Sequence, residues 1–169
     1  TQCTSPGPGY RYTGLVGSGD CNDSAPAVNP GAAEVCNSID DDCDALVDEG
    51  VQTTFYLDAD SDGYYTGSPV LACTSPGAGY VTSVTGSGDC DDSNPALNPT
   101  TIWYLDADND NYYVTGSGTT QCTSPGAGYR YTGLVGSGDC NDSAPAVNPG
   151  AAEVCNSIDD DCDALVDEG

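Results

Sequence analysis

The sequence predicts small, β-rich and mostly irregular tandem repeats that form an extended array and not one globular core. Three observations support this prediction. Residues 1–50 recur as residues 120–169 with a single difference, Pro8 against Ala127. Gly, Pro and Cys account for 22, 11 and 10 of the 169 residues, which indicates many turns and a disulfide framework. The apolar segments are so short that no unit can bury a core large enough to hold it alone.

A shorter repeat lies inside the long one. The segment TTFYLDADSDGYY that begins at Thr53 returns as TIWYLDADNDNYY at Thr101, and CTSPGAGY occurs at Cys73 and Cys122. The chain therefore has the organisation of a segment from a longer tandem array. We expect three parts, which are the C-terminal part of a long repeat unit, a short unit and a truncated long unit: residues 1–52, 53–99 and 100–169.

Each secondary-structure element is expected to be short. Residues 53–57 and 101–105 are rich in β-branched and aromatic side chains and end at acidic turns, which predicts strands. Residues 80–85 and 129–135 alternate well enough to be strands too. The segments SPGAG and GSG are typical of turns, and residues 32–36 have the composition for one helical turn at most.

The charge balance excludes several classes of function. The chain has 27 acidic residues against two basic ones, Arg11 and Arg130, and no histidine, which gives a formal net charge of −25. Without histidine or lysine there is no imidazole base, no Schiff-base lysine and no His-ligated zinc or copper. Nucleic acid and anionic membranes repel such a chain, and no apolar run approaches the ~20 residues of a membrane span. We expect no nucleic-acid partner, no membrane insertion in this segment and no enzymatic activity.

The ten cysteines are predicted to form disulfides inside each unit. The short unit contains only Cys73 and Cys90, so we expect these two to form a disulfide. By analogy, we expect the equivalent cysteines of the other units to pair in the same way. Zinc held by cysteines is the rival interpretation, but the chain has no CxxC pair and no histidine. An even number in every unit is typical of secreted proteins, which predicts an extracellular or cell-surface location. The expected pairs are Cys3–Cys21, Cys36–Cys43, Cys73–Cys90, Cys122–Cys140 and Cys155–Cys162.

The acidic residues are clustered along the chain. None occurs in residues 1–19, 63–88 or 111–138. A solvated acidic surface would spread its charge more evenly, whereas carboxylates packed this densely repel one another unless a cation lies between them. Two arginines, each expected to pair with a carboxylate or to stack on tyrosine, supply too little counter-charge. We therefore expect the cation to come from solution.

Two loops have the spacing of the first half of an EF-hand loop. Asp58, Asp60 and Asp62 occupy positions 1, 3 and 5, Gly63 permits the sharp turn and Tyr64 offers its carbonyl. The second copy has asparagine instead of glycine, which also accepts the left-handed conformation. Neither copy has the acidic position 12, so the DC[DN]D motifs are expected to complete the sites. The predicted ligands are Asp58, Asp60, Asp62, Tyr64, Asp89, Asp91, Asp92, Asp106, Asp108, Asp110, Tyr112, Asp139, Asn141 and Asp142, with Asp20, Asn22 and Asp23 in the motif of residues 1–52.

The long unit carries a further acidic loop in the segment GAAEVCNSIDDDCDALVDEG, which we call the cassette (residues 31–50 and 150–169). Its carboxylates also alternate, and a later acidic residue can close the loop. An all-oxygen, flexible and carboxylate-rich set favours Ca²⁺ over Mg²⁺, which demands octahedral geometry. Bound calcium thus joins the disulfides as a predicted stabilising element. The expected ligands are Asp40, Asp42, Asp44, Leu46, and Asp48 or Glu49, and in the second copy Asp159, Asp161, Asp163, Leu165, Asp167 and Glu168.

The strings DADSDGYY, CTSPGAGY, GDCDDSNPALNP and the cassette together resemble the MopE-type metal-binding motif repeat of secreted bacterial proteins. The resemblance covers essentially the whole chain. It implies a secreted, tandemly repeated and calcium-associated module of surface or extracellular proteins. The chain is more loosely similar to the thrombospondin type-3 repeats, which wrap calcium. The copper association in the family name does not transfer, because histidine and methionine are absent and Trp103 lies in a strand motif.

Two functions are consistent with these features. The first is a structural segment of an extracellular filament or cell-surface stalk, rigidified by Ca²⁺ and disulfides, which contacts neighbouring repeats and further copies of itself. The alternative is an adhesin or binding module that presents a tyrosine-rich face to glycan or protein partners. That alternative predicts variation between copies on one face, whereas the copies barely differ. O-glycans on Ser24, Ser143 or residues 115–120 remain an open alternative to unmodified loops.

Overall fold

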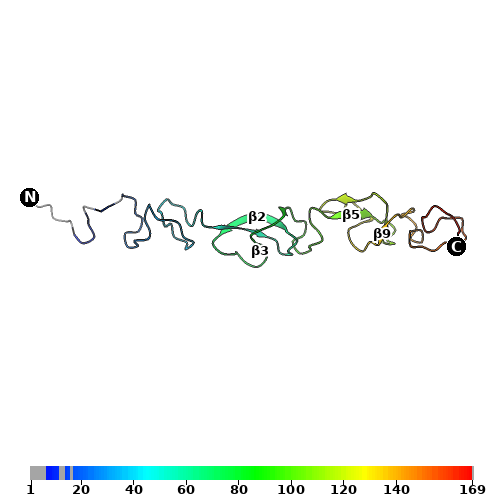
Figure 1. Ribbon diagram of the computed structural model, residues 1–169, viewed down its shortest axis with the longest axis horizontal. Helices are drawn as coiled ribbons and strands as arrows, with labels where there is room; N and C mark the ends of the chain where they lie inside the picture. Colours follow the sequence, from blue (N-terminus) through cyan, green and yellow to red (C-terminus); the bar gives the residue numbers. More distant parts are fainter. Residues whose placement is uncertain (1–6, 12–13, 16, 169) are drawn as a thin grey trace, which may run out of the picture. The chain divides into compact units, whose positions relative to one another are not determined.

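The computed structural model describes residues 7–11, 14–15 and 17–168, and within them it contains short strands and no helix. The chain divides into two compact units, Thr1–Phe55 with Val70–Pro76, and Tyr56–Pro69 with Gly77–Gly169. Figure 1 shows the strands in the green and yellow parts of the ribbon. They are β1 (Thr53–Leu57), β2 (Tyr64–Ala72), β3 (Tyr80–Val81), β4 (Gly86–Ser87), β5 (Ile102–Leu105), β6 (Tyr112–Tyr113), β7 (Thr119–Thr120), β8 (Tyr129–Arg130) and β9 (Gly136–Ser137).

The first group of strands has the order β3-β1-β2-β4. β1 and β3 are antiparallel, with Tyr56 opposite Val81, and β2 and β4 are parallel, with Tyr64 opposite Gly86. The rings of Tyr56 and Tyr65 pack at a centroid distance of 4.8 Å. This arrangement places the acidic residues after β1 beside the start of β2.

The second group has related pairings but forms two sheets, with the orders β7-β5-β8 and β6-β9. β5 pairs antiparallel with β7 and β8, and Tyr104 lies opposite Arg130. β6 and β9 are parallel, with Tyr112 opposite Gly136. β5, β8, β6 and β9 therefore correspond to β1, β3, β2 and β4, which confirms the strands predicted in the two related segments. The strands expected at residues 80–85 and 129–135 are only two residues long, and residues 32–36 form no helical turn.

The buried interior is small and contains more carboxylates than apolar side chains. Among the described residues, the buried apolar side chains are Val28, Phe55, Trp103 and Val147. Trp103 donates its indole N–H to the Gln121 carbonyl at 2.8 Å, and its ring meets that of Tyr131 edge-on. Burial of a carboxylate is unfavourable unless a hydrogen bond or an opposite charge compensates for it, so the buried aspartates require an explanation. The buried aspartates are Asp41, Asp48, Asp58, Asp106, Asp139 and Asp160.

The disulfides differ from the predicted pairing. The structure contains Cys21–Cys43, Cys36–Cys73, Cys90–Cys122 and Cys140–Cys162. Cys155 is exposed and has no partner among the described residues; it corresponds by repeat to Cys36. Cys3 lies outside the described residues, but its expected partner Cys21 bonds Cys43. The predictions that fail are thus Cys3–Cys21, Cys36–Cys43, Cys73–Cys90, Cys122–Cys140 and Cys155–Cys162.

The pairing fails for two reasons: Cys36–Cys73 and Cys90–Cys122 join different predicted units, and the bridges inside a unit join the DC motif to the cassette. Just before the cassette, the Asn29 N–H donates to the Asp41 carbonyl at 2.9 Å, which holds the DDDC string beside the preceding DC motif. Cys43 therefore meets Cys21, and the second copy repeats the same bond. In the CTSPG strings that the structure describes, Cys73 and Cys122 each bond a cysteine of the motif before them, Cys36 and Cys90. Repeat periodicity shows which cysteines are equivalent, and equivalence does not specify connectivity.

We predict that Cys90→Ser leaves Cys122 as a free thiol and not Cys73. Loss of this bridge, which spans a sequence separation of 32, lowers the free energy of unfolding by about 3–4 kcal/mol according to the loop-entropy model. Alkylation under non-reducing conditions, Asp-specific proteolysis and mass spectrometry identify the freed thiol, and urea denaturation measures the stability. A free Cys73 in the variant would contradict the observed pairing.

Candidate metal centres

The first loop (residues 58–64) is organised by its own carboxylates. Asp58 Oδ2 accepts the Gly63 N–H at 3.1 Å, Asp60 Oδ1 accepts the Asp62 N–H at 3.2 Å, and Asp62 Oδ1 accepts the Tyr64 N–H at 2.7 Å. Each aspartate thus uses one oxygen to hold the backbone. The other oxygens, Oδ1 of Asp58 and Oδ2 of Asp60 and Asp62, are buried without a hydrogen-bond partner. One carboxylate oxygen from each of the three residues lies within 4.8 Å of the other two, a spacing that a bound cation can bridge.

The DCDD motif reaches the first loop from the following turn. Asp92 Oδ1 accepts the Ala59 N–H at 2.8 Å, and Asp89 Oδ2 is buried without a partner. Asp60, Asp89 and Asp92 form a further group whose oxygens lie within 4.8 Å. Asp91, by contrast, accepts the N–H and hydroxyl of Ser93, so it stabilises the exposed turn. The structure therefore brings two of the three predicted acidic donors of this motif to the loop.

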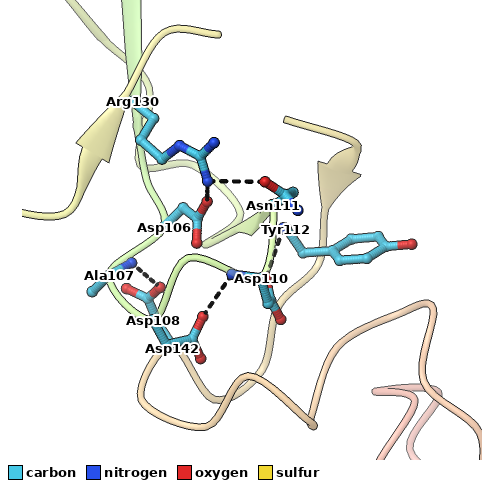
Figure 2. A network of polar contacts seen from close by, with 8 residues as sticks. All are labelled: Asp106, Ala107, Asp108, Asp110, Asn111, Tyr112, Arg130 and Asp142. Atoms are coloured by element: carbon cyan, nitrogen blue, oxygen red, sulfur yellow. Dashed lines mark hydrogen bonds and ion pairs between the residues drawn. The ribbon is translucent and has the colours of Figure 1, made fainter. Parts of the chain in front are cut away.

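The second loop (residues 106–112) has the same design (Figure 2). Asp110 and Tyr112 donate their backbone N–H groups to Asp108 and Asp110, and Ala107 donates to Asp142 at 2.6 Å. Asp106 is fully buried. It accepts the Arg130 guanidinium at 2.6 Å, which is one of the two arrangements expected for the arginines. The buried oxygens without a partner here are Asp106 Oδ1, Asp108 Oδ2, Asp110 Oδ2 and Asp139 Oδ2.

The cassette loop is held by a similar set of bonds. Asp40 accepts the N–H groups of Asp44 and Ala45, at 3.1 and 2.9 Å, and Asp44 accepts that of Leu46 at 2.8 Å. Ala45 takes the left-handed conformation that glycine has in the first loop, with φ of 76°. The oxygens of Asp40, Asp42 and Asp44 lie within bridging range. The second copy repeats these bonds at Asp159, Asp161 and Asp163.

The two residues considered for closing the cassette loop have different surroundings. Asp48 is buried and accepts the N–H groups of Asn37 and Ser38, so it holds the backbone. Glu49 Oε2 is buried without a partner and belongs to a group with Asp42. In the second copy, Asp167 accepts the equivalent N–H groups although it is exposed, and Glu168 Oε2 is buried without a partner.

Glu34 is an organising residue that the sequence analysis missed. Its Oε1 accepts the N–H groups of Asp41 and Asp42 at 2.7 and 3.0 Å, and its Oε2 accepts that of Asp48 at 2.8 Å. It can also share a cation with Asp42 and Glu49. Glu153 makes the equivalent bonds in the second copy. The available signal was its isolation, because it is the one acidic residue in positions 24–39.

The DCND motif of residues 20–23 is a turn with exposed side chains, whereas its counterpart at residues 139–142 places Asp139 and Asp142 at the second loop. Asp20 accepts the Asn22 N–H at 2.8 Å, and Asn22 accepts the Ser24 hydroxyl at 2.7 Å. Asp23 is exposed. Asn141 likewise accepts the Ser143 hydroxyl at 2.8 Å. These asparagines therefore stabilise the turn locally.

The clusters are electrostatically unfavourable without a cation. Burial raises the pKa of Asp89, Asp108 and Asp139 above the usual aspartate value, and facing carboxylates raise it further. The pKa of Asp42 and Asp161 rises for the same two reasons. The unpartnered atoms are all carboxylate oxygens, which are the donors that hard divalent cations prefer. The described residues of these sites thus fit a hard metal ion and lack the nitrogen and thioether donors that suit copper.

A comparison with protein families supports metal binding. The family model described as "Putative metal-binding motif" and named for copper binding in MopE matches residues 20–49, 89–102 and 139–168. Three segments of the chain match the MopE-type metal-binding motif. All three begin at a DC[DN]D motif, and those at residues 20–49 and 139–168 continue into the cassettes, whereas the first and second loops lie outside the matched segments. Neither a curated protein nor a solved structure matches the chain.

We predict that Glu34→Gln destabilises the cassette of the metal-free protein. The Glu34 oxygens accept three backbone N–H groups, and the substitution replaces one of these oxygens. We expect the free energy of unfolding to fall by about 1–3 kcal/mol. Urea denaturation in chelator measures the effect. Asp23→Asn removes the same charge from an exposed side chain and is the control. Equal effects of the two substitutions would show that Glu34 acts only through net charge.

We predict opposite pH dependences with and without metal. Because the pKa values of Asp108 and Asp139 are raised in the fold, their protonated forms favour folding below about pH 4, and this stabilisation is lost as the pH rises through the raised values. The metal-free chain should therefore resist urea better at about pH 4 than at about pH 7. With metal the order reverses, since protons compete for the ligands. Parallel pH profiles in both states would contradict the assignment of these carboxylates as ligands.

Proposed function

We propose that this chain is a structural, calcium-binding repeat segment of an extracellular filament or cell-surface stalk. The observation that carries the proposal is the set of buried carboxylate oxygens without partners, which recur in the loops and cassettes. Calcium suits these sites because it accepts many oxygen ligands in irregular geometry. The bound ion supplies positive charge that offsets the repulsion, so calcium binding and folding are coupled.

The first loop illustrates the proposed coordination. Asp58, Asp60, Asp62 and Asp89 each present a buried unpartnered oxygen to the ion, and the Tyr64 carbonyl is a further ligand of the kind used in EF-hand loops. The oxygens bound to backbone N–H groups keep these side chains in position before the ion arrives. Such pre-organisation lowers the ordering cost of binding.

The disulfides support a structural role in a tandem repeat. Cys36–Cys73 and Cys90–Cys122 each join the cysteine of one motif to the CTSPG string that follows it in sequence. Successive repeats are therefore linked covalently as well as by the chain. Four disulfides among the described residues fit a secreted or extracellular protein. No helix among those residues is long and apolar enough to cross a membrane.

The aromatic residues favour this proposal over an adhesin with a tyrosine-rich binding face. Tyr56 packs on Tyr65, Tyr104 on Tyr113, and Trp103 on Tyr131. These rings pack on one another, so they do not form an open aromatic face for a glycan. We further propose that the chain has no enzymatic activity, and that its partners are neighbouring repeats and other copies of itself. The absence of histidine and lysine supports the first of these points.

We predict that Asp89→Asn lowers the number of bound calcium ions by one. The substitution weakens a ligand of the first loop, so it should lower stability when calcium is present and, by relieving carboxylate repulsion, raise stability when calcium is absent. Metal analysis after dialysis against calcium counts the ions, and calorimetric titration gives their affinities. Asp91→Asn is the matched control, since Asp91 is bonded to Ser93 in an exposed turn.

Two outcomes would overturn the proposal. A wild-type chain that binds no calcium after dialysis would refute the calcium function. Stiff native fibres that persist unchanged in chelator, viewed by electron microscopy, would refute the role of calcium in rigidity.

A further inference from the structure

The first and second loops differ in what holds their leading carboxylate. Asp58 Oδ2 accepts the backbone N–H of Gly63 at 3.1 Å. Asp106 Oδ2 accepts Arg130 Nη1 at 2.6 Å, and the same nitrogen donates to Asn111 Oδ1 at 3.0 Å (Figure 2). In both loops the remaining oxygen, Oδ1, is buried without a partner. A full positive charge thus replaces a peptide dipole next to one ligand position.

The strand register shows that this difference is positional. Val81 lies opposite Tyr56 in the first group of strands, and Arg130 lies opposite Tyr104 in the second. Tyr56 and Tyr104 occupy the same place in the repeated strand motif. Arg130 is therefore the direct counterpart of Val81.

Two further residues accommodate the guanidinium. Asn111 replaces the glycine of the first loop and provides a second acceptor for Arg130. Residues 129–136 contain one residue more than their counterpart 80–86, and the longer segment includes Gly133. Gly133 has a φ of +77°, and a Cβ there would lie 2.9 Å from Arg130 Nη2. Arginine, asparagine and glycine thus form one built arrangement.

We propose that Arg130 sets the calcium affinity of the second loop and makes it a weaker site than the first loop; this inference rests on the proposed calcium function. The guanidinium repels the incoming dication and partly neutralises the cluster when the ion is absent. Asp106 is fully buried and the Arg130 side chain is 29% exposed, so solvent screens this interaction incompletely. The two loops consequently fill at different calcium concentrations, and the second loop keeps its order at concentrations where the first loop is empty.

The single tryptophan provides a site-specific readout. Trp103 lies on β5, three residues before Asp106, so it is about 10 Å away along the strand. The first loop has Phe55 at the equivalent position. Terbium is a luminescent cation similar in size to calcium, and tryptophan sensitises its emission over short distances. Selective excitation of Trp103 therefore reports ion binding at the second loop, and displacement by calcium gives the calcium affinity.

The experiment compares Arg130→Gln with Arg11→Gln. Arg11 is the repeat counterpart of Arg130, and its side chain is exposed, so its substitution changes the net charge equally. Arg130→Gln is expected to raise the calcium affinity of the tryptophan-sensitised site about tenfold. Arg11→Gln is expected to leave it unchanged. Gly133→Ala keeps the net charge and displaces the guanidinium, and it carries the test if Arg130→Gln does not fold without calcium; its affinity should rise in the same direction.

The outcomes separate this inference from the proposed function. Absence of calcium binding in the wild-type chain would refute the calcium function itself. Normal calcium binding with unchanged sensitised affinity in Arg130→Gln and Gly133→Ala would overturn the role of Arg130 alone. An equal increase in Arg11→Gln would overturn it as well, since the effect would then follow from net charge.

Discussion

Repulsion between carboxylates that share a small space is the constraint on which the rest of this structure depends. Asp58 and Asp106 are buried, and each faces other acidic side chains in its loop. Only four apolar side chains among the described residues are buried, and none is less exposed than Asp58 or Asp106. Hydrophobic burial of that extent cannot offset several desolvated charges. The order of the chain is therefore tied to the counter-charge that its acidic loops receive.

Backbone hydrogen bonds and disulfides make it feasible to hold these charges close together. In the first loop, one oxygen of each aspartate fixes the backbone, which leaves the other oxygen buried without a partner. Cys21–Cys43 and Cys140–Cys162 fasten each cassette loop to the DC turn before it. Because a disulfide reduces the entropy of the unfolded chain, it favours folding without adding apolar surface. The covalent links thus supply stability that the small core does not.

Features that depend on contacts between residues close in sequence were predictable, and features that depend on contacts between distant parts of the chain were not. The DxDxD spacing predicts the first loop because its backbone contacts join residues at most five positions apart. Glu34 was missed because its contact with Asp48 spans 14 positions. The strand predicted at residues 80–85 stops early because the Thr85 N–H bonds the Gly63 carbonyl, a contact that belongs to the loop. The disulfide pairs were predicted wrongly because they also join residues far apart in sequence, and repeat equivalence does not show which cysteines the fold brings together.

The repeat combines a constant element with a variable one. The two cassettes keep the same bonds, so Glu34 and Glu153 both accept an aspartate N–H at 2.7 Å. The strand-linked loops keep their backbone pattern but differ in the partner of the first carboxylate, Gly63 in one and Arg130 in the other. The strand pairing is the same in both loops, because the backbone of Val81 pairs with Tyr56 just as the backbone of Arg130 pairs with Tyr104. The positive charge that balances the carboxylates can therefore differ between repeats while the fold stays the same. It comes from a side chain such as Arg130 in one repeat and from a cation in solution in another.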